Sequence, residues 1–596
     1  MSGDIHLASA SYFAAARRRA AVAAVVAGLG IAGLGIAGLG ADALAQSDDA
    51  GQWTMYGRTY DNTRFSPLTD INADNVKNLK VAYAFSLGAL LSNEATPIVI
   101  GDILYVTTSQ GPKFVYAIDA KTGVLRWQRS FEIPDDVAQF ACCGQVNRGV
   151  AYANGKVFVG RLDGKLTALD AKTGADVWTA TVVDYKQGSV ITSPPLIVKN
   201  TAVIGFGGGE FGARGYLSAY DLETGDLVWK TWTVPGPGDP GNETWKGDSW
   251  KTGGAAPWFV GSYDPKLNVI YYGTSNPSPW HAAVRGTGTS DYGKFTNLYS
   301  SATVAFHGTS GRILWHLQST PQDAWDFDGV NELVLADLKI GGATVPAMMK
   351  ADRNGFFFVA NRKTGELISA KPFVPVTWAT GFDLKTGRPI EDPAKRPRLN
   401  YKATDICPNL LGGKNWQPMS YNPMTGLVYI PANNLCMDME DTEVEYRRGA
   451  FFLGKEFPTK RGPGGNGGEL IAWDPVKNQK VWGLKERHPF NGGTMTTAGN
   501  LVFHGDWEGW FKALDATTGE VLWKFNVGSG MGAGPMTFKL DGKQYVAVVV
   551  GRSATLPNFL GAIEADLGFV KLHGNSVGAD MAAATPQAGM LFVFAL

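Results

Sequence analysis

The sequence has little charge, few cysteines and no motif for a covalently attached haem. Charged residues make up 18% of the 596 residues, and 54 basic side chains are balanced by 54 acidic ones. Nucleic-acid-binding chains carry an excess of positive charge, so this balance argues against a nucleic-acid partner. The four cysteines form no C-x-x-C-H sequence, which excludes a built-in c-type haem.

Glycine and aromatic residues are abundant instead. The chain has 75 glycines, and aromatic residues account for 11% of it. This mixture suits many short strands joined by tight turns better than it suits helices. The length also exceeds that of a usual single domain, so several domains or a repeat architecture are expected.

The first 45 residues differ from the rest of the chain. Three arginines at 17–19 precede an apolar stretch, and Ala-Leu-Ala at 43–45 offers a small-x-small cleavage site. This layout predicts a secretory signal peptide over 1–45, export to the periplasm and a mature domain over 46–596. The alternative is an uncleaved membrane anchor, because the Gly-rich run over 20–40 is just long enough to span a bilayer.

One motif, A-x-D-x-x-T-G-x-x-x-W, recurs along the mature chain. Clear copies lie at 117–127, 168–178, 219–229 and 513–523, and weaker ones at 305–315, 360–365 and 472–482. The first three copies are 51 residues apart, about the length of a four-stranded propeller blade. Each copy reads as a strand, an Asp-x-x-Thr-Gly turn and a second strand. The Trp is expected to pack flat between adjacent blades.

The repeats predict an all-β fold, an eight-bladed β-propeller with tryptophan docking motifs. Seven copies are visible, and an eighth blade would be closed by both chain ends. The longer gaps over 229–305 and 364–472 are expected to hold loops inserted over one face. A propeller alone would also suit a non-catalytic scaffold, so the function must come from residues outside the repeat.

The cysteines divide into an unusual pair and an ordinary one. Cys142 and Cys143 are adjacent, so a disulfide between them closes an eight-membered ring and staples no distant segments. A functional role is therefore favoured over two incidental thiols in an oxidising compartment. Cys407 and Cys436 are separated by 29 residues and are typical of a loop staple.

Acidic and amide side chains lie at expected loop positions. They are Glu210, Asn276, Asp326 and Asp328. Each alone would be read as a turn-capping residue, but together they offer the oxygen ligands that a hard cation prefers. The glycines at 207–209 would let the backbone approach a flat ligand closely.

Together these features resemble the quinoprotein alcohol dehydrogenases, the methanol and ethanol dehydrogenase family that uses pyrroloquinoline quinone (PQQ). The segments that carry the resemblance are Ala-Cys142-Cys143-Gly-Gln-Val-Asn-Arg148-Gly, Gly-Gly-Gly-Glu210-Phe-Gly, Gly-Gly-Ala-Ala-Pro-Trp258, Gly-Thr-Ser-Asn276-Pro-Ser-Pro-Trp, Asp-Ala-Trp-Asp326-Phe-Asp328-Gly and Lys-Ala-Asp-Arg353-Asn-Gly. They cover nearly all of the chain after the leader, in the family's order. The family fold is an eight-bladed propeller, which agrees with the repeat count.

The resemblance implies a role for each site residue. PQQ would lie flat between Trp258 and the Cys142–Cys143 ring. The positions that match its polar contacts are Glu94, Arg148, Thr192, Gly208, Gly209 and Asn415. Arg353 would lie beside the reactive carbonyl, and Asp326 would be the general base that takes the alcohol proton. Cys407 and Cys436 match the family's second disulfide.

The resemblance also implies a metal. Glu210, Asn276 and Asp326 match the family's metal site, where a cation acts as a Lewis acid on the quinone. Calcium-dependent members usually carry a small neutral residue where this chain has Asp328, and lanthanide-dependent members carry an Asp. A second carboxylate suits a trivalent ion, so a lanthanide is predicted; the alternative is calcium with Asp328 outside the ligand set.

The substrate and the electron acceptor follow from the same resemblance. The segment before Trp258 looks more like the ethanol branch, so primary alcohols longer than methanol are predicted, with sugars or polyols as the alternative. Electrons would pass to a separate cytochrome c, and a homodimer is compatible with the sequence. Asn491 and the loop over 551–557 depart from the family's pattern, which leaves the cofactor contacts there open.

Overall fold

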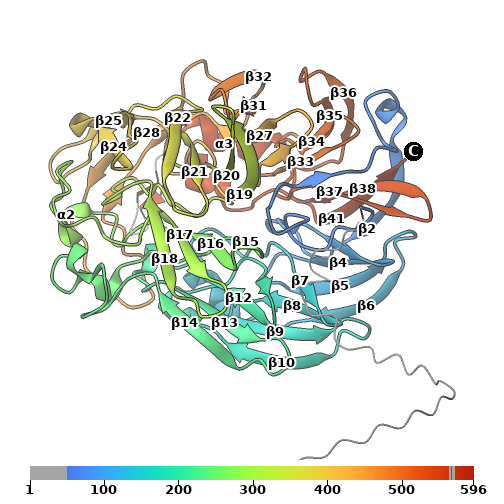
Figure 1. Cartoon of the computed structure of the whole chain (residues 1–596), viewed down its shortest axis with the longest axis horizontal. Helices are drawn as coiled ribbons and strands as arrows, with labels where there is room; N and C mark the ends of the chain where they lie inside the picture. The colour runs from blue at the N-terminus through green and yellow to red at the C-terminus, as the bar shows by residue number, and fades with distance from the viewer. Residues whose placement is uncertain (1–49, 563–564, 567–570, 573) are drawn as a thin grey trace, which may run out of the picture. The chain divides into compact units, whose positions relative to one another are not determined.

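The computed structural model describes residues 50–562, 565–566, 571–572 and 574–596, and these form one compact unit made mostly of short strands (Figure 1). Residues 1–49, which include the expected signal peptide, lie outside the described residues. Within the described ranges, no helix has both the length and the apolar character that a membrane crossing needs.

Antiparallel four-stranded sheets follow one another in chain order around a common centre (Figure 1). The first of them are β3 (Ile98–Ile100), β4 (Ile103–Thr107), β5 (Phe114–Asp119) and β6 (Leu125–Ser130); β7 (Ala151–Ala153), β8 (Lys156–Gly160), β9 (Lys165–Asp170) and β10 (Asp176–Thr181); and β11 (Leu196–Val198), β12 (Thr201–Ile204), β13 (Tyr216–Asp221) and β14 (Leu227–Trp232). In each sheet the repeat motif supplies the last two strands and the turn between them.

The same strand order continues along the chain. The next sheets are β15 (Ser262–Asp264), β16 (Val269–Gly273), β17 (Ala302–His307) and β18 (Ile313–Gln318); β19 (Val334–Ile340), β20 (Ala343–Ala351), β21 (Phe356–Asn361) and β22 (Leu367–Pro372); β26 (Ser420–Asn422), β27 (Leu427–Asn433), β31 (Gly468–Asp474) and β32 (Gln479–Glu486); and β33 (Thr494–Thr497), β34 (Leu501–Gly505), β35 (Trp510–Asp515) and β36 (Val521–Asn526), with β1 (Phe65–Ser66) parallel to β33. The weaker motif copies therefore have the same local structure as the clear ones.

A final sheet joins the two ends of the described chain. Strand β2 (Lys80–Ser86) pairs with β41 (Met590–Ala595), which pairs with β38 (Lys543–Val550) and then β37 (Met536–Leu540). The expectation that one sheet is closed by both chain ends is confirmed. This pairing ties the second strand of the described chain to its last one, so the ring of sheets is fastened by hydrogen bonds.

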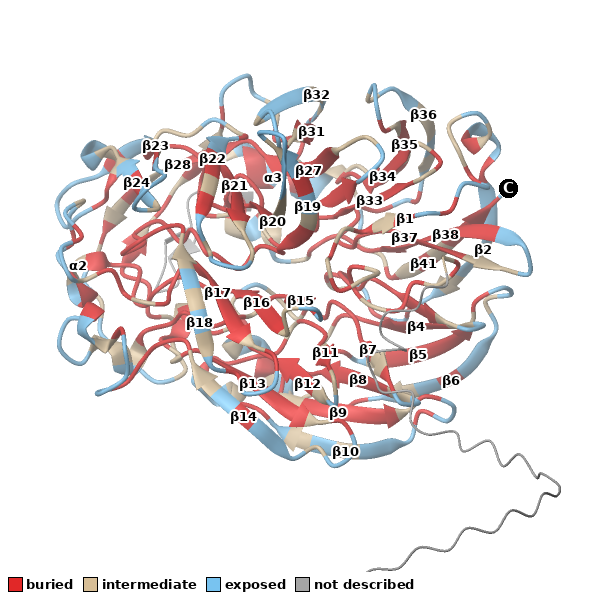
Figure 2. Cartoon of the chain, in the orientation of Figure 1, coloured by how far each residue is buried: buried red, intermediate tan, exposed pale blue. Residues whose placement is uncertain are grey.

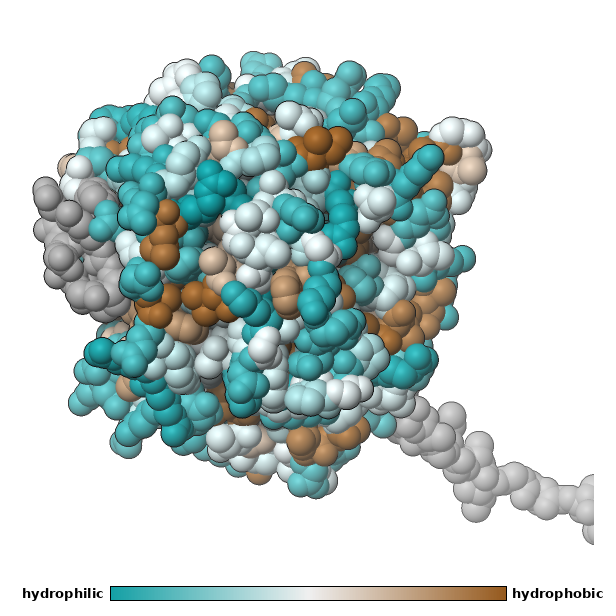
Figure 3. Space-filling view, turned by 90° about the vertical axis from the view of Figure 1, so that its left-hand side faces the viewer, coloured by the Kyte–Doolittle hydropathy of each residue, from teal (hydrophilic) through white to brown (hydrophobic). Residues whose placement is uncertain are grey.

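Burial falls from the inner to the outer strands. Strand β5 is buried at its central positions, whereas the outermost strand β6 is exposed or half-buried everywhere except at Trp127. Figure 2 shows the same gradient, with red inner strands and pale blue outer ones. Inner strands are covered on both faces by neighbouring sheets, so they read as continuous apolar runs. On the face in Figure 3, apolar side chains lie in small groups among hydrophilic ones.

The repeated Trp packs against the Thr-Gly turn of the next sheet, as the motif predicts. The Trp178 indole donates from Nε1 to the Leu222 carbonyl (3.1 Å), and a Cβ added to Gly225 would lie 2.7 Å from the Trp178 ring. Gly174 meets the Trp127 ring in the same way. The turn glycine thus has two tasks, a positive φ and a close approach to a neighbouring ring.

A Gly225→Ala variant is expected to lose more stability than a Gly426→Ala control. Both glycines have a positive φ (+77° and +70°), but Gly426 has no atom within 4 Å of an added Cβ. Both changes incur roughly 1–2 kcal/mol for the left-handed backbone, and Gly225→Ala adds about 1–3 kcal/mol of overpacking against Trp178. Denaturant unfolding measures the free energies, and equal losses would contradict the docking contact.

Segments inserted between the sheets hold most of the remaining elements. These are η5 (Asn242–Thr244), η6 (Ser249–Thr252), α2 (Ala282–Arg285), β23 (Ala379–Asp383), β24 (Arg388–Glu391), η7 (Pro393–Lys395), β25 (Ala403–Ile406), β28 (Leu435–Asp441), β29 (Lys455–Glu456) and β30 (Thr459–Arg461). They fall in the two long gaps of the repeat, and they contact each other. The His281 N–H donates to the Leu453 carbonyl (3.2 Å), and the second segment also contacts the loop at Glu210, outside these gaps, where the Phe452 N–H donates to the Glu210 carbonyl (2.7 Å).

Shorter elements lie elsewhere between the strands. They are η1 (Val76–Asn78), η2 (Asp135–Phe140), η3 (Tyr185–Gln187) and η4 (Gly209–Phe211) and, near the C-terminus, η8 (Asn558–Ala562), β39 (Ala565–Asp566), β40 (Lys571–Leu572) and α3 (Ser576–Ala584). The predicted loop staple is present, since Cys407 and Cys436 form a disulfide that joins the start of the 407–416 segment to β28.

Candidate active site

A cavity of about 320 Å³ gathers most of the residues singled out in the sequence. Those that line it are Glu94, Cys142, Cys143, Arg148, Thr192, Gly208, Glu210, Trp258, Asp326, Arg353 and Asn415. Gly209, Asn276 and Asp328 are buried beside the cavity and do not line it. An added Cβ at Gly209 would lie 2.5 Å from Asn276 Oδ1, so only glycine fits between the cavity wall and that amide.

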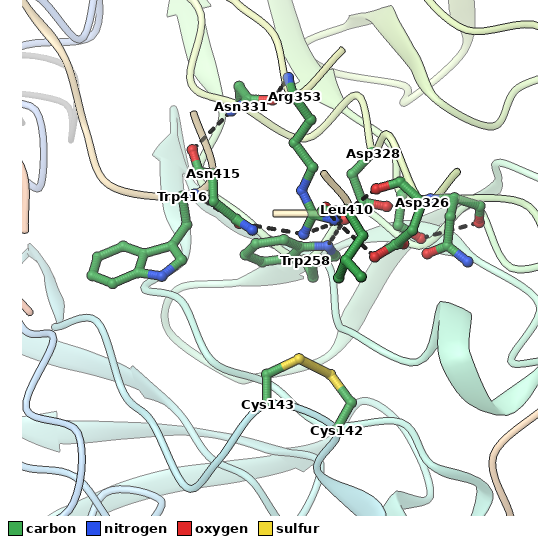
Figure 4. Close-up of polar contacts among 12 residues, drawn as sticks. Cys142, Cys143, Trp258, Asp326, Asp328, Asn331, Arg353, Leu410, Asn415 and Trp416 are labelled. Carbon is green, nitrogen blue, oxygen red and sulfur yellow. Dashed lines mark hydrogen bonds and ion pairs between the residues drawn. A yellow bond between two sulfur atoms is a disulfide. The ribbon is translucent and has the colours of Figure 1, made fainter. Parts of the chain in front are cut away.

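Two flat groups face each other across the cavity. Figure 4 shows the Trp258 indole on one side and the Cys142–Cys143 disulfide on the other. The indole Nε1 donates to Asp328 Oδ2 (2.8 Å), and the main-chain carbonyl of Trp258 accepts from Ser193 Oγ (3.0 Å), so both the ring and its backbone are held. A rigid slot between two flat walls fits a planar aromatic ligand such as a quinone.

A charged pair lies at one end of the slot. Arg148 contacts Glu94 at 2.9 Å and donates to Thr192 Oγ1 at 2.8 Å, and both charged side chains are at most 5% exposed. Burial raises the pKa of Glu94 to about 7, although the Arg148 guanidinium lowers it. The guanidinium also stacks over Trp416, 4.7 Å from the ring centre. Arg148 and Thr192 thus offer fixed donors for a ligand carboxylate or carbonyl.

A second charged cluster lies beside Trp258. Arg353 contacts Asp326 Oδ2 and Asp328 Oδ2, each at 3.1 Å, and donates to Asn415 Oδ1 at 3.3 Å. Figure 4 shows these side chains pointing toward one another from separate segments. Asp326 has a φ of +64°, a left-handed conformation that is uncommon outside glycine and that gathers at functional sites.

Burial controls the ionisation of this cluster. It raises the pKa of Asp326 well above the usual range, and that of Asp328 as well, while Arg353 lowers both. Burial and the nearby Asp328 carboxylate raise the pKa of Glu210 to about 7. When ionised, three carboxyl groups around one arginine carry more negative charge than Arg353 alone neutralises, so an added cation would stabilise the ionised form that burial disfavours.

The oxygen atoms of the cluster fit a hard cation. Within the described residues, Asn276 Oδ1 and Asp326 Oδ1 are buried without a hydrogen-bond partner. Buried oxygens without partners are expensive unless a ligand satisfies them, and amide and carboxylate oxygens are hard-cation ligands. In the described part of the chain no three His, Cys, Asp or Glu side chains are already gathered for a metal. Asp328 instead bonds Arg353, Trp258 and the Asn276 N–H.

The two departures from the family's pattern both reach the cavity. Asn491 lines it, as do Ser553, Thr555 and Leu556 of the 551–557 loop. Thr555 Oγ1 donates to the Cys143 carbonyl at 3.1 Å, so the loop contacts the vicinal disulfide directly.

Other residues of the site carried no signal in the sequence. Apart from Phe211 and Trp280, which belong to segments of the family resemblance, the apolar side chains that line much of the cavity are Phe140, Leu410, Leu411, Phe451, Leu453, Phe490 and Phe559. Most come from inserted segments, where no periodicity predicts an inward position. Asn331, which bonds the segments of Arg353 and Asn415, was also missed, because a single buried Asn has no sequence signature.

Comparisons with known proteins agree with this geometry. The family model for the PQQ glucose/ethanol/alcohol dehydrogenase β-propeller domain matches residues 53–406 and 466–546. A lanthanide-dependent methanol dehydrogenase of Methylacidiphilum fumariolicum is 42% identical over 528 residues, 84% of this chain and 85% of the relative. The quinoprotein alcohol dehydrogenase PedH of Pseudomonas putida is 43% identical over 524 residues, 84% of this chain and 86% of the relative.

Solved structures give the same result. A europium-containing methanol dehydrogenase superposes with a TM-score of 0.88 at 40% sequence identity, covering 93% of this chain and all of that one. The quinohemoprotein alcohol dehydrogenase of Comamonas testosteroni reaches 0.82 at 37% identity, covering 93% of this chain and 83% of that one. At these sequence identities, both structures indicate membership of the same family as well as a shared fold. The chain therefore belongs to the family of PQQ-dependent alcohol dehydrogenases and is an enzyme of that type.

Proposed function

We propose that the protein oxidises primary alcohols longer than methanol to aldehydes. The observation that carries the proposal is the pairing of Asp326 and Arg353 at the edge of a slot walled by Trp258 and the vicinal disulfide. When bound in this slot, PQQ supplies the two-electron acceptor for the hydride of the carbinol carbon. A scaffold protein would keep the docking tryptophans but has no use for this constellation.

Asp326 is the group that takes the hydroxyl proton. Its Oδ2 is held by Arg353, whereas Oδ1 has no hydrogen-bond partner among the described residues. A carboxylate fixed through one oxygen presents the other to the substrate in a constant orientation, which suits a general base. The raised pKa of Asp326 makes its carboxylate a stronger base than an exposed aspartate.

The two polar ends of the slot hold the cofactor. Arg148 with Thr192 would bind acidic or carbonyl groups at one end, and Arg353 with Asn415 would bind oxygens at the other. Gly208 would contact the ligand through backbone groups, Gly209 would keep the wall close to the Asn276 amide, and Glu94 would act through its pair with Arg148. The fixed Trp258 ring would keep the cofactor flat and exclude water from one face.

The metal would bind beside Asp326. Glu210, Asn276 and Asp326 supply oxygen ligands, with Asp328 as a fourth, and we favour a lanthanide over calcium. The support is the number of carboxyl groups, three beside the single Arg353 guanidinium, which suits a trivalent ion, and the likeness to a relative named lanthanide-dependent.

The apolar cavity wall favours an alcohol with an apolar chain. Phenylalanines and leucines outnumber the amide and hydroxyl side chains beyond the slot, and they offer no hydrogen bonds to the several hydroxyls of a sugar or polyol. The domain over 46–596 would be an eight-bladed propeller, with each sheet that holds a motif copy and the closing sheet of β2 and β41 as one blade. Periplasmic export and a separate cytochrome c acceptor complete the proposal; a homodimer is compatible with it.

Reconstitution of the full chain tests the proposal. The protein is loaded with PQQ and either La³⁺ or Ca²⁺, and dye-linked oxidation of ethanol, longer primary alcohols and glucose is measured. Turnover of alcohols with La³⁺ present is expected. No alcohol turnover with either metal would overturn the function, and turnover with Ca²⁺ alone would overturn the lanthanide assignment.

A further inference from the structure

Asn331 lies directly behind the site without touching the cavity. It is 1% exposed and stands in the loop that leads from Asp326 into β19. The cavity-lining residues do not include it. A contact with substrate or cofactor therefore does not explain why this polar side chain is buried. The explanation must lie in the hydrogen bonds that its amide makes with the protein.

The Asn331 amide joins two segments that are distant in sequence. Its Oδ1 accepts from the Arg353 N–H (3.1 Å), and its Nδ2 donates to the carbonyls of Lys414 (3.1 Å) and Asn415 (2.7 Å). Figure 4 shows Asn331 joined to both the Arg353 and the Asn415 segments. Every donor of the amide is used, and each partner is a backbone group.

The same two segments meet again at the cavity through their side chains. Arg353 reaches from Asp326 Oδ2 to Asn415 Oδ1, so its guanidinium bridges the proposed base and the polar end of the slot. The backbones of residues 353 and 415 thus set the place of both groups, and Asn331 fixes these backbones relative to each other. A displacement of about 1 Å at such groups lowers rates by roughly a hundredfold.

The residue after Asn331 strengthens the same connection. Glu332 contacts Lys414 Nζ at 2.6 Å, and that ammonium donates to the Asn415 carbonyl at 3.0 Å. The segment around Asn415 thus keeps one anchor when Asn331 is removed. Loss of the amide should displace the segment without unfolding it.

We propose that Asn331 is a positioning residue that sets the spacing between the Arg353 guanidinium and the Asn415 amide. This inference rests on the proposed function, since it takes these two groups as contacts of the cofactor. Asn331 acts only through them, so its removal should change cofactor binding and kcat and should leave the apolar binding of the alcohol chain unchanged.

The test compares Asn331→Ala with Asn422→Ala in the full chain. Asn422 is equally buried and also bonds backbone and hydroxyl groups of neighbouring segments, but it does not line the cavity. PQQ affinity is measured by absorbance titration, and kcat and KM by dye-linked alcohol oxidation. For Asn331→Ala we expect PQQ affinity and kcat to fall by roughly 10–100-fold each, with the alcohol KM within about threefold. For Asn422→Ala we expect Tm to fall by a comparable amount. Its PQQ affinity should stay within about twofold of the wild type.

A double-mutant cycle separates positioning from general damage. In an Asn415→Ala background, Asn331→Ala should weaken PQQ binding by less than about threefold, because the group it positions is already gone. If Asn331→Ala does not fold, Asn331→Asp replaces it, since it keeps the acceptor for the Arg353 N–H and loses the donors to 414 and 415.

Wild-type PQQ affinity in the Asn331 variant, or an undiminished effect in the Asn415→Ala background, would overturn the inference. These outcomes concern binding, so they remain distinct from a failure of the proposed function, in which the wild-type chain binds PQQ and oxidises no alcohol.

Discussion

Asp326→Asn is expected to lower kcat for alcohol oxidation by roughly 10²–10⁴-fold while the chain stays folded. The amide has the same size, and its oxygen can still accept from Arg353 Nη1, which lies 3.1 Å from Oδ2 in the wild type. Its nitrogen would then replace Oδ1, the atom proposed to take the proton, and an amide nitrogen cannot accept one. The loss is therefore chemical rather than steric, and because Asp326 is also a proposed metal ligand, bound La³⁺ is quantified to separate loss of the base from loss of the metal. Dye-linked kcat and KM on PQQ-loaded protein measure the loss, with the bound PQQ quantified by absorbance.

Asp323→Asn is the matched control for this change. Asp323 is a buried carboxylate three residues earlier, but its oxygens accept from the Trp325 N–H (2.9 Å) and Ser301 Oγ (3.1 Å), and it does not line the cavity. Its replacement should reduce stability and leave kcat within about threefold of the wild type. If Asp326→Asn keeps more than a tenth of wild-type kcat, or if both variants lose kcat equally, Asp326 is not the base.

The repeat motif predicts the sheets well because it encodes a contact between neighbours. A Trp at the end of one copy and a Gly in the next, such as Trp178 and Gly225, must meet wherever the sheets are stacked. The sheet that pairs β2 with β41 is contacted by the last motif copy, because Trp523 Nε1 donates to the Leu79 carbonyl just before β2 (3.1 Å). Local chemistry thus determines this part of the fold.

The inserted segments could be expected only as gaps in the repeat. Their positions depend on contacts between distant residues, such as the backbone hydrogen bond from His281 to Leu453. No periodic pattern specifies such a contact. The apolar cavity wall shares this property, since Phe451 and Phe559 come from segments with no repeat and face inward only because of long-range packing.

The site residues were recognised by their resemblance to a family and not by spacing. Nothing in the order of Glu94, Arg148 and Trp258 says that they meet, yet the structure places Arg148 within 2.9 Å of Glu94 and 5.2 Å from the centre of the Trp258 ring. Residues that act through backbone carbonyls are harder still to recognise. Asn331 was missed for that reason, because a buried amide bonding two main-chain segments looks in sequence like any loop Asn.

Asp328 has two tasks in this geometry, and they predict different consequences of its loss. As a carboxylate beside Glu210 and Asp326 it would bind a trivalent ion. In the structure it also accepts from Trp258 Nε1 (2.8 Å) and contacts Arg353 (3.1 Å), so it fixes one wall of the slot. Removing the side chain affects both tasks, whereas replacing it by Asn removes the charge and keeps an acceptor for the indole.

Lanthanide-dependent turnover is expected to fall by roughly 10–100-fold in both Asp328→Ala and Asp328→Asn, with a smaller loss under Ca²⁺ in the Asn variant. A trivalent ion depends more on the lost charge than a divalent one, because the Coulomb attraction scales with the charge of the ion. The measurements are turnover against La³⁺ and Ca²⁺ concentration in PQQ-loaded protein, and La³⁺ affinity by calorimetry. Unchanged La³⁺ affinity in both variants would remove Asp328 from the ligand set. Suppose that La³⁺ affinity is unchanged, that Asp328→Ala loses activity equally with both metals, and that Asp328→Asn keeps its activity. The role of Asp328 would then be to hold Trp258 and Arg353.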